Sequence, residues 1–259
     1  MPQSPVQSPP VQSGAEPVLI AGGPVGVLIS HGFTGSTHSI RDWAQYLGAA
    51  GLTVSAPRLP GHGTTWQDMN TTRWADWYGE VTRAFDVLRD TCTTVFAMGL
   101  SMGGTLVLRL AEERAQEVAG VVVVNASLAT ERRDAKILPL LSRVVPSFPG
   151  IGSDIKKPGV TEQAYRKIPL KAAYSLQQAW PVVRGDLGRI TCPVLAFRSR
   201  VDHVVEPVSG RALVQALGSR VEERVLEDSY HVATLDNDAP AIFEGSLAFV
   251  RAHAPAATS

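Results

Sequence analysis

The feature that most limits the fold is a repeated alternation of short apolar runs with longer segments of helical periodicity. Several runs are unbroken stretches of valine, leucine and isoleucine, which is typical of parallel strands covered on both faces. We expect strands at Val18–Ala21, Val25–Ser30, Leu52–Ala56, Thr94–Met98, Val121–Asn125, Val194–Arg198 and Val221–Leu226. The clearest helical face carries Trp74, Trp77, Tyr78, Val81, Phe85 and Leu88. This alternation predicts a mostly parallel central sheet with helices on both faces.

One interval interrupts the rhythm. Between residues 126 and 188 there is no convincing strand, but there are many apolar residues and prolines. Structureless loops longer than about 15 residues are uncommon in compact domains. We therefore expect a small, mainly helical cap or lid at residues 127–185, inserted into a core made of residues 17–126 and 186–259.

The first 16 residues differ in composition from the rest. They contain prolines among serine and glutamine, and the tetrapeptide Pro-Val-Gln-Ser occurs twice. Dense proline removes backbone donors, and there is little apolar surface to bury, so residues 1–16 are predicted to form a disordered, solvated tail. The alternative is a proline-rich docking segment.

Composition and charge exclude several classes of protein. Hydrophobic residues make up 44% of the 259 residues, and 24 Lys and Arg balance 24 Asp and Glu. Without a net field we expect no nucleic-acid partner. The longest apolar run, Val118–Val124, is too short to span a membrane, and no basic residue precedes Arg41, so neither a stable membrane anchor nor a signal peptide is expected. Cys92 and Cys192 lack metal-ligand spacing. These features predict a cytoplasmic globular protein without a metal site, and they leave monomer and homodimer open.

A glycine-flanked serine follows the fourth predicted strand. The segment Gly99-Leu100-Ser101-Met102-Gly103-Gly104 joins this strand to a helical segment, giving G-x-S-x-G in a strand–turn–helix context. Such a tight turn needs strained backbone angles at the serine and small neighbours on both sides. It presents the hydroxyl at the positive end of a helix. Ser101 is therefore the candidate nucleophile.

A serine nucleophile needs a base, and the base needs an orienting acid. In this architecture the chain order is serine, acid, histidine. Asp202 follows the strand at 194–198, and His231 follows the last strand. Both positions lie at the carboxyl ends of strands, where open parallel sheets place their sites. We therefore predict a triad of Ser101, Asp202 and His231.

Other residues of the same types fit these roles less well. Glu227, Asp228 and Asp236 are too near His231 in sequence to approach it from another strand. The five remaining histidines occupy loops or the last helix, and we expect one of them, His31, to fix the loop that follows the second strand. They are His31, His38, His62, His203 and His253.

Acyl transfer also needs donors for a developing oxyanion. One is the backbone N–H of the residue after the nucleophile, here Met102. The other is expected from the glycine-containing loop after the second strand, where the N–H of Phe33 is best placed. Phe33 is also a candidate wall of an acyl pocket, and simple core packing is its structural alternative.

Motifs from five separate loops occur together in this chain. They are His31-Gly32-Phe33-Thr34-Gly35, Pro60-Gly61-His62-Gly63, Gly99 to Gly104, Asp202-His203-Val204-Val205 and Asp228 to Asp236. Together they resemble the α/β-hydrolase superfamily, and within it the bacterial monoacylglycerol lipases and small thermostable carboxylesterases of the bacillus type. The resemblance spans roughly residues 17–253.

This resemblance implies an α/β-hydrolase fold, the triad and oxyanion donors named above, and no cofactor. In monoacylglycerol lipases of this group a cap glutamate and a nearby isoleucine contact the glycerol head. The matching positions are Glu162 and Ile151. The alternative for Glu162 is a solvated carboxylate on a helix face.

The resulting expectation is a serine carboxylic-ester hydrolase that acts on monoacylglycerol and releases a fatty acid and glycerol through an acyl-enzyme. A generic short- or medium-chain carboxylesterase and a thioesterase remain open, because the same triad serves all three. A third alternative is a non-catalytic protein that uses the hydrolase fold to bind a ligand. Such proteins usually lack a triad member, whereas this chain has all three.

Overall fold

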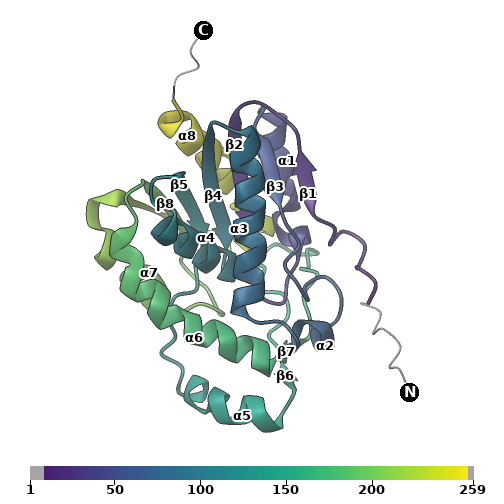
Figure 1. Cartoon of the computed structure of the whole chain (residues 1–259). Helices are drawn as coiled ribbons and strands as arrows, with labels where there is room; N and C mark the ends of the chain where they lie inside the picture. Colours follow the sequence, from purple (N-terminus) through teal and green to yellow (C-terminus); the bar gives the residue numbers. More distant parts are fainter. Residues whose placement is uncertain (1–8, 256–259) are drawn as a thin grey trace.

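The computed structural model describes residues 9–255, and its centre is a seven-stranded sheet flanked by helices (Figure 1). The strand order is β1-β3-β2-β4-β5-β8-β9. Only β1 runs antiparallel to its neighbour, and the other pairs are parallel. The strands are β1 (Val18–Ile20), β2 (Val25–Ser30), β3 (Thr53–Ala56), β4 (Thr94–Leu100), β5 (Val118–Val124), β8 (Val194–Ser199) and β9 (Val221–Leu226). All seven lie where the alternation predicts them.

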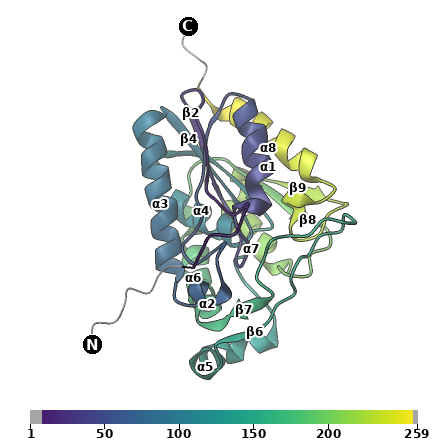
Figure 2. The ribbon, with the colours of Figure 1, turned by 90° about the vertical axis from the view of Figure 1, so that its right-hand side faces the viewer.

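Helices cover both faces of this sheet (Figure 2). One face packs against α1 (Arg41–Ala49) and α8 (Ala239–His253), and the other packs against α3 (Trp74–Thr91), α4 (Met102–Glu113) and α7 (Val208–Leu217). The reason for unbroken apolar strands is visible in β2. Val27 and Ile29 belong to the core on the α1 side, whereas Leu28 belongs to the core on the α3 side.

The short elements lie mainly in the connections. They are the helix α2 (Trp66–Met69) and the 3₁₀ helices η1 (Thr37–Ile40), η2 (Arg133–Ile137), η3 (Leu187–Arg189), η4 (Gly218–Arg220) and η5 (Ala233–Leu235).

The excursion between β5 and β8 contains two helices and a small ribbon. These elements are α5 (Leu138–Val144), β6 (Ser147–Pro149), β7 (Lys167–Pro169) and α6 (Leu170–Asp186). The antiparallel β6–β7 ribbon was not predicted, because three residues per strand are too few to show a period. Leu176 and Val183 of α6 join the same core cluster as α4, so the last part of the interval 127–185 packs with the core. Figure 1 shows α5 at the lower end of the molecule, away from the sheet.

Part of the segment predicted as a solvated tail packs against the core: Gln12, Ser13 and Glu16 are exposed, but Ala15 is not. Ala15 is fully buried and lies against Gly63. The Gln12 N–H donates to the Gly63 carbonyl at 2.8 Å, and the Arg41 guanidinium donates to the carbonyls of Gly14 and Glu16. Backbone groups hold this segment, and composition does not reveal them. Residues 1–8 of the predicted tail lie outside the described residues.

Cys92 and Cys192 are both buried free thiols. Within residues 9–255, no helix combines the length and the apolar character needed to cross a bilayer.

Candidate active site

Ser101 occupies the sharp turn between β4 and α4. Its φ of 55° lies in the left-handed region, which is unusual for a residue with a side chain. A Cβ added at Gly99 would lie 2.3 Å from the Gly103 backbone, and one added at Gly103 would lie 2.1 Å from the Ser30 carbonyl oxygen. The turn can therefore form only with glycine at both positions. Met102 is the first residue of α4, so the serine lies at the helix N-terminus.

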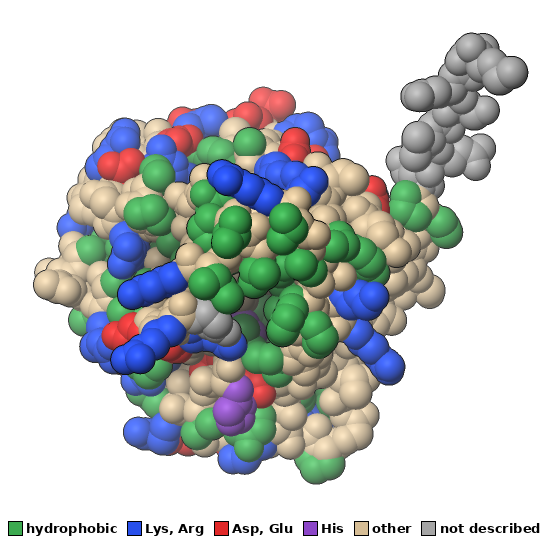
Figure 3. Space-filling model, turned by 90° about the horizontal axis from the view of Figure 1, so that it is seen from below, with side chains coloured by type: hydrophobic (Ala, Val, Ile, Leu, Met, Phe, Trp, Pro, Cys, Tyr) green, Lys and Arg blue, Asp and Glu red, His purple; other side chains and the backbone are tan. Residues whose placement is uncertain are grey.

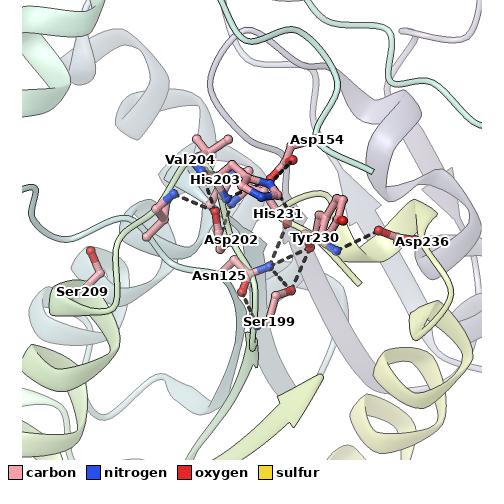
Figure 4. Close-up of polar contacts among 12 residues, drawn as sticks. Asn125, Asp154, Ser199, Asp202, His203, Val204, Ser209, Tyr230, His231 and Asp236 are labelled. Carbon is pink, nitrogen blue, oxygen red and sulfur yellow. Dashed lines mark hydrogen bonds and ion pairs between the residues drawn. The ribbon is translucent and has the colours of Figure 1, made fainter. Parts of the chain in front are cut away.

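The three side chains of the predicted triad lie in one hydrogen-bonded row. Ser101 Oγ is 2.9 Å from His231 Nε2, and His231 Nδ1 is 2.8 Å from Asp202 Oδ2. Asp202 comes from the loop after β8 and His231 from the loop after β9, and Figure 4 shows the two side chains facing each other. With Nδ1 protonated toward the carboxylate, Nε2 is free to accept the serine hydroxyl. The structure thus brings the three residues together across 130 positions of sequence.

Asp202 is held as a charged carboxylate. Burial raises the pKa of this carboxyl, but the His231 charge, the His231 hydrogen bond and two backbone donors lower it below its ordinary value. The two donors are the N–H groups of Val204 and Val205, at 2.8 and 2.7 Å from Oδ1. The second oxygen is left for the imidazole.

His231 is a stronger base than an ordinary histidine. Burial alone would lower its pKa, but the Asp202 charge and hydrogen bond raise the pKa above the ordinary value. The carboxylates of Glu162 and Asp154 act in the same direction. The arrangement is therefore suited to accept a proton from Ser101 and to hold it on the imidazole.

The loop after β2 passes directly beside Ser101. A Cβ on Gly32 would lie 3.3 Å from the Ser101 Cβ. His31 fixes this loop from below, because its Nδ1 lies 3.0 Å from the Gly32 carbonyl and its Nε2 accepts the Leu59 N–H. Among the described residues, neither the Phe33 nor the Met102 N–H has a hydrogen-bond acceptor. These two amides therefore keep their donor capacity for a ligand.

The phenyl ring of Phe33 contacts other aromatic rings. It meets Trp77 edge to face at a centroid distance of 5.9 Å and His62 at 6.5 Å. The ring is partly buried against the α3-side core. Core packing of the ring and use of the amide by a ligand are therefore compatible.

The two cap positions differ in their placement. Glu162 is partly buried, and its carboxylate lies over Gly35, where a Cβ would come within 2.6 Å of Oε1. Burial raises the pKa of Glu162 to about 7, against the lowering effects of His231 and Ser39. Ile151, in contrast, is 55% exposed. The structure therefore brings Glu162, but not Ile151, into the buried surroundings of the triad.

Asn125 is a site residue that the sequence analysis missed. It is buried at the end of β5 with a φ of 47°. Its Nδ2 donates to the His231 carbonyl at 2.8 Å and to Ser199 Oγ at 2.9 Å, and its Oδ1 accepts the Ser199 N–H. Asn125 thereby joins the ends of β5 and β8 to the loop after β9, which carries His231 and which we call the histidine loop. The available signal was an amide side chain directly after the four consecutive valines that end β5, at the edge where the site residues gather.

Asp154 and Asp236 were also missed as structural partners of the site. Asp154 is 7% exposed and contacts both His203 and His231 (Figure 4). Asp236 is 1% exposed, and its carboxylate accepts four backbone N–H groups. Neither residue has a sequence spacing that indicates its partners, because most of those partners are backbone groups that the fold brings near.

A serine in a strained strand–helix turn, hydrogen-bonded to a histidine–aspartate pair at the carboxyl edge of this sheet, defines an α/β-hydrolase. The chain belongs to the family described as serine aminopeptidase, S33, which matches residues 25–238. It is 45% identical over 248 residues to the thermostable monoacylglycerol lipase of Bacillus sp. (strain H-257), covering 95% of this chain and 98% of that protein. It is 27% identical over 242 residues to a carboxylesterase of Bacillus subtilis (strain 168), covering 91% and 96%.

Solved structures show the same fold. A structure described as that of metagenome-derived lipolytic enzymes superposes with a TM-score of 0.91 at 43% identity, covering 94% of this chain and all of that one. The monoacylglycerol lipase of Paleococcus ferrophilus superposes with a TM-score of 0.75 at 19% identity, covering 92% and 98%. The predicted fold class and family resemblance are confirmed.

Proposed function

We propose that this protein is a serine carboxylic-ester hydrolase that cleaves monoacylglycerols into a fatty acid and glycerol. The observation that carries the proposal is the continuous hydrogen-bonded row from Ser101 through His231 to Asp202, set in a strained turn. The 45% identity to a monoacylglycerol lipase across nearly the whole chain supports the substrate class.

In the proposed reaction, Ser101 Oγ attacks the ester carbonyl while His231 Nε2 takes the hydroxyl proton. The charged Asp202 holds the imidazole orientation and stabilises the imidazolium. His231 then gives the proton to the leaving alkoxide, which departs as glycerol and leaves an acyl group on Ser101. Water repeats the sequence on the acyl-enzyme, releasing the fatty acid and the free serine.

The negative oxygen of each tetrahedral intermediate would be held by the N–H groups of Phe33 and Met102. Such a donor typically stabilises the transition state by about 3 kcal/mol. The Met102 donor lies in the first turn of α4, so the positive end of the helix adds to the effect. Glycine at position 32 lets this backbone approach Ser101 closely.

The surface near the cap favours a substrate with an acyl chain. The face seen from below gathers hydrophobic side chains around a hollow (Figure 3). The exposed large hydrophobic residues in this part of the chain are Ile137, Leu140, Val144, Phe148 and Ile151. A hydrocarbon chain that binds here would move out of water and onto an apolar surface, which is favourable.

Glu162 supports a polar head on the substrate. A partly buried carboxyl with a pKa of about 7 can accept hydrogen bonds from glycerol hydroxyls when charged. A triacylglycerol has no hydroxyl to offer and would leave this group unpaired. Ile151 is retained as a proposed contact to the glycerol head on the resemblance alone.

The test compares initial rates on 1-lauroylglycerol, trilaurin, p-nitrophenyl butyrate, a lauroyl thioester and an amino-acid p-nitroanilide. The last substrate probes the activity named in the family description. We expect the monoester to be preferred over the triester by at least tenfold in kcat/KM. A preference for the thioester or the anilide, or activity on the butyrate alone, would contradict the monoacylglycerol assignment.

A further inference from the structure

A segment of the excursion crosses over the site without forming a helix or strand. We call residues 152–165 the strap. It runs between β6 and β7 and contacts the loops that carry the triad. Near its end, the Tyr165 N–H donates to the Thr34 carbonyl at 3.1 Å, and the Tyr165 hydroxyl donates to the Gly61 carbonyl at 2.8 Å. The strap is therefore fixed to the loop that contains Phe33.

Near its start, the strap is fixed to the other side of the site by Asp154. The carboxylate of this residue bridges two loops. Oδ2 accepts the backbone N–H of His203 at 3.1 Å and that of His231 at 3.2 Å, and Oδ1 lies 2.8 Å from His203 Nδ1. The Asp154 carbonyl also accepts the Val232 N–H at 3.0 Å. One side chain thus joins the loop after β8 to the loop after β9 (Figure 4).

His203 completes this bridge from the loop after β8, which also carries Asp202. It directly follows Asp202, and its imidazole is half exposed. The ring packs edge to face on Tyr230, which directly precedes His231, at a centroid distance of 4.7 Å. The His203 side chain therefore touches the strap through Asp154 and the histidine loop through Tyr230.

A second carboxylate reinforces the strap. Asp236 accepts the N–H groups of Lys156 and Lys157 from the strap and that of Tyr230 from the histidine loop. The strap also holds Glu162, whose N–H donates to Ser153 Oγ at 3.0 Å. Ser153, which directly precedes Asp154, therefore connects Asp154 to Glu162, the proposed glycerol contact.

We infer that Asp154 is a positioning residue for the triad, a buried carboxylate supplied by the strap that holds the Asp202 and His231 loops at their working distance. The inference rests on the proposed roles of Ser101, His231 and Asp202, but not on monoacylglycerol as the substrate. It explains why a carboxylate with 7% exposure faces three donors from two different loops. A buried group of this kind is costly unless its donors are present.

The geometry predicts different effects for two substitutions. Asp154→Ala removes the shared acceptor, so both loops shift and misalign the base, and displacements of about 1 Å can cost about 10²-fold in rate. Asp154→Asn keeps one oxygen for the two backbone donors, and its amide can donate to His203 Nδ1 if that ring changes tautomer. The asparagine variant therefore removes the charge while keeping the bridge.

The charge has its own readout. Asp202, Glu162 and Asp154 are the carboxylates that raise the pKa of His231. Removing the Asp154 charge lowers that pKa, so the acidic limb of the pH profile of kcat/KM moves to lower pH. We expect a displacement that exceeds the uncertainty of the fitted profiles. A residue with only a structural role would not move this limb.

The experiment measures kcat and KM for p-nitrophenyl butyrate between pH 5 and 9 on wild type, Asp154→Ala, Asp154→Asn and Glu112→Gln. The last is a control that changes a buried carboxyl remote from the strap, in α4. We expect Asp154→Ala to lose about 10²-fold in kcat per folded molecule with KM within about threefold. Asp154→Asn should retain more than a tenth of kcat and show the displaced limb, and Glu112→Gln should show neither effect.

Two results would overturn the inference. One is a kcat of Asp154→Ala within twofold of wild type. The other, decisive if the alanine variant does not fold, is an Asp154→Asn enzyme with an unmoved acidic limb. A wild-type enzyme without activity on both the butyrate ester and 1-lauroylglycerol would instead contradict the proposed function, so the two failures are distinguishable.

Discussion

Two carboxyl groups near His231 have opposite pKa shifts. Asp202 is held below its ordinary pKa by the imidazole and two backbone donors, whereas burial raises the pKa of Glu162 to about 7. At neutral pH the first is charged, and the second is close to half protonated. The two carboxyl groups thus differ in charge because their surroundings differ.

At the residue scale, this pair predicts the pH dependence of ester hydrolysis. His231 must be neutral to take the proton from Ser101, and its pKa is raised, so kcat/KM should begin to fall at a higher pH than an ordinary histidine would give as the pH decreases. Glu162→Gln removes one of the charges that raise this pKa, so its limb should lie at lower pH. Stopped assays on p-nitrophenyl butyrate measure the acidic limb of the wild type and that of Glu162→Gln. Coincident pH profiles of the two enzymes would contradict the assigned electrostatics.

Glu162 also makes a residue-scale prediction about substrates. Glu162→Ala should reduce kcat/KM for 1-lauroylglycerol by about tenfold more than kcat/KM for ethyl laurate, because only the first substrate has hydroxyls that this carboxyl can bind. The two esters share their acyl chain, so ethyl laurate is the matched control. Equal losses on both would remove the proposed contact to glycerol.

At the scale of the element, the turn between β4 and α4 depends on close backbone contact. Gly103→Ala would place a Cβ 2.1 Å from the Ser30 carbonyl oxygen, which neither backbone can avoid without moving. We expect a loss of about 3 kcal/mol or more in the free energy of unfolding, with loss of activity. The control is Gly79→Ala in α3, where a Cβ meets nothing within 4 Å. There the higher helix propensity of alanine should increase the free energy of unfolding by up to about 1 kcal/mol. Urea unfolding curves for both variants test this contrast, and equal midpoints would contradict it.

Helix α4 also carries a buried carboxyl. Glu112 is 1% exposed, and burial raises its pKa to about 8, against the effect of the Arg109 hydrogen bond. The folded state therefore binds this proton more tightly than the unfolded chain, so the contribution to stability declines as pH rises from about 4.5 to 8.

Glu112→Gln removes this titration and can still accept from Arg109. Its stability relative to wild type should increase between pH 6 and pH 9, as measured by urea unfolding at each pH. A difference that stays constant with pH would show that Glu112 remains charged in the folded protein.

At the scale of the whole molecule, the sequence predicts what local pattern encodes. Apolar runs gave the seven strands of the main sheet, and chain order indicated which serine, aspartate and histidine would meet. These three side chains do lie in contact, because His231 is 2.9 Å from Ser101 Oγ through Nε2 and 2.8 Å from Asp202 Oδ2 through Nδ1. Their catalytic roles remain our proposal.

Other features depend on contacts that no local pattern records. The β6–β7 ribbon has strands of three residues, the segment around Ala15 is held by backbone hydrogen bonds, and Asp154 finds its donors 49 and 77 positions away. His203 illustrates the point, since the sequence predicts only a loop residue at that position. The fold places it between the strap and Tyr230.

The central claim is that Ser101 is the nucleophile of a carboxylic-ester hydrolase, and the most direct measurement is kcat of Ser101→Ala on 1-lauroylglycerol. The variant removes only the hydroxyl, so its circular dichroism and unfolding midpoint should match those of wild type. We predict a loss on the order of 10⁶ in kcat. A folded variant that retains a tenth or more of wild-type activity would contradict the account.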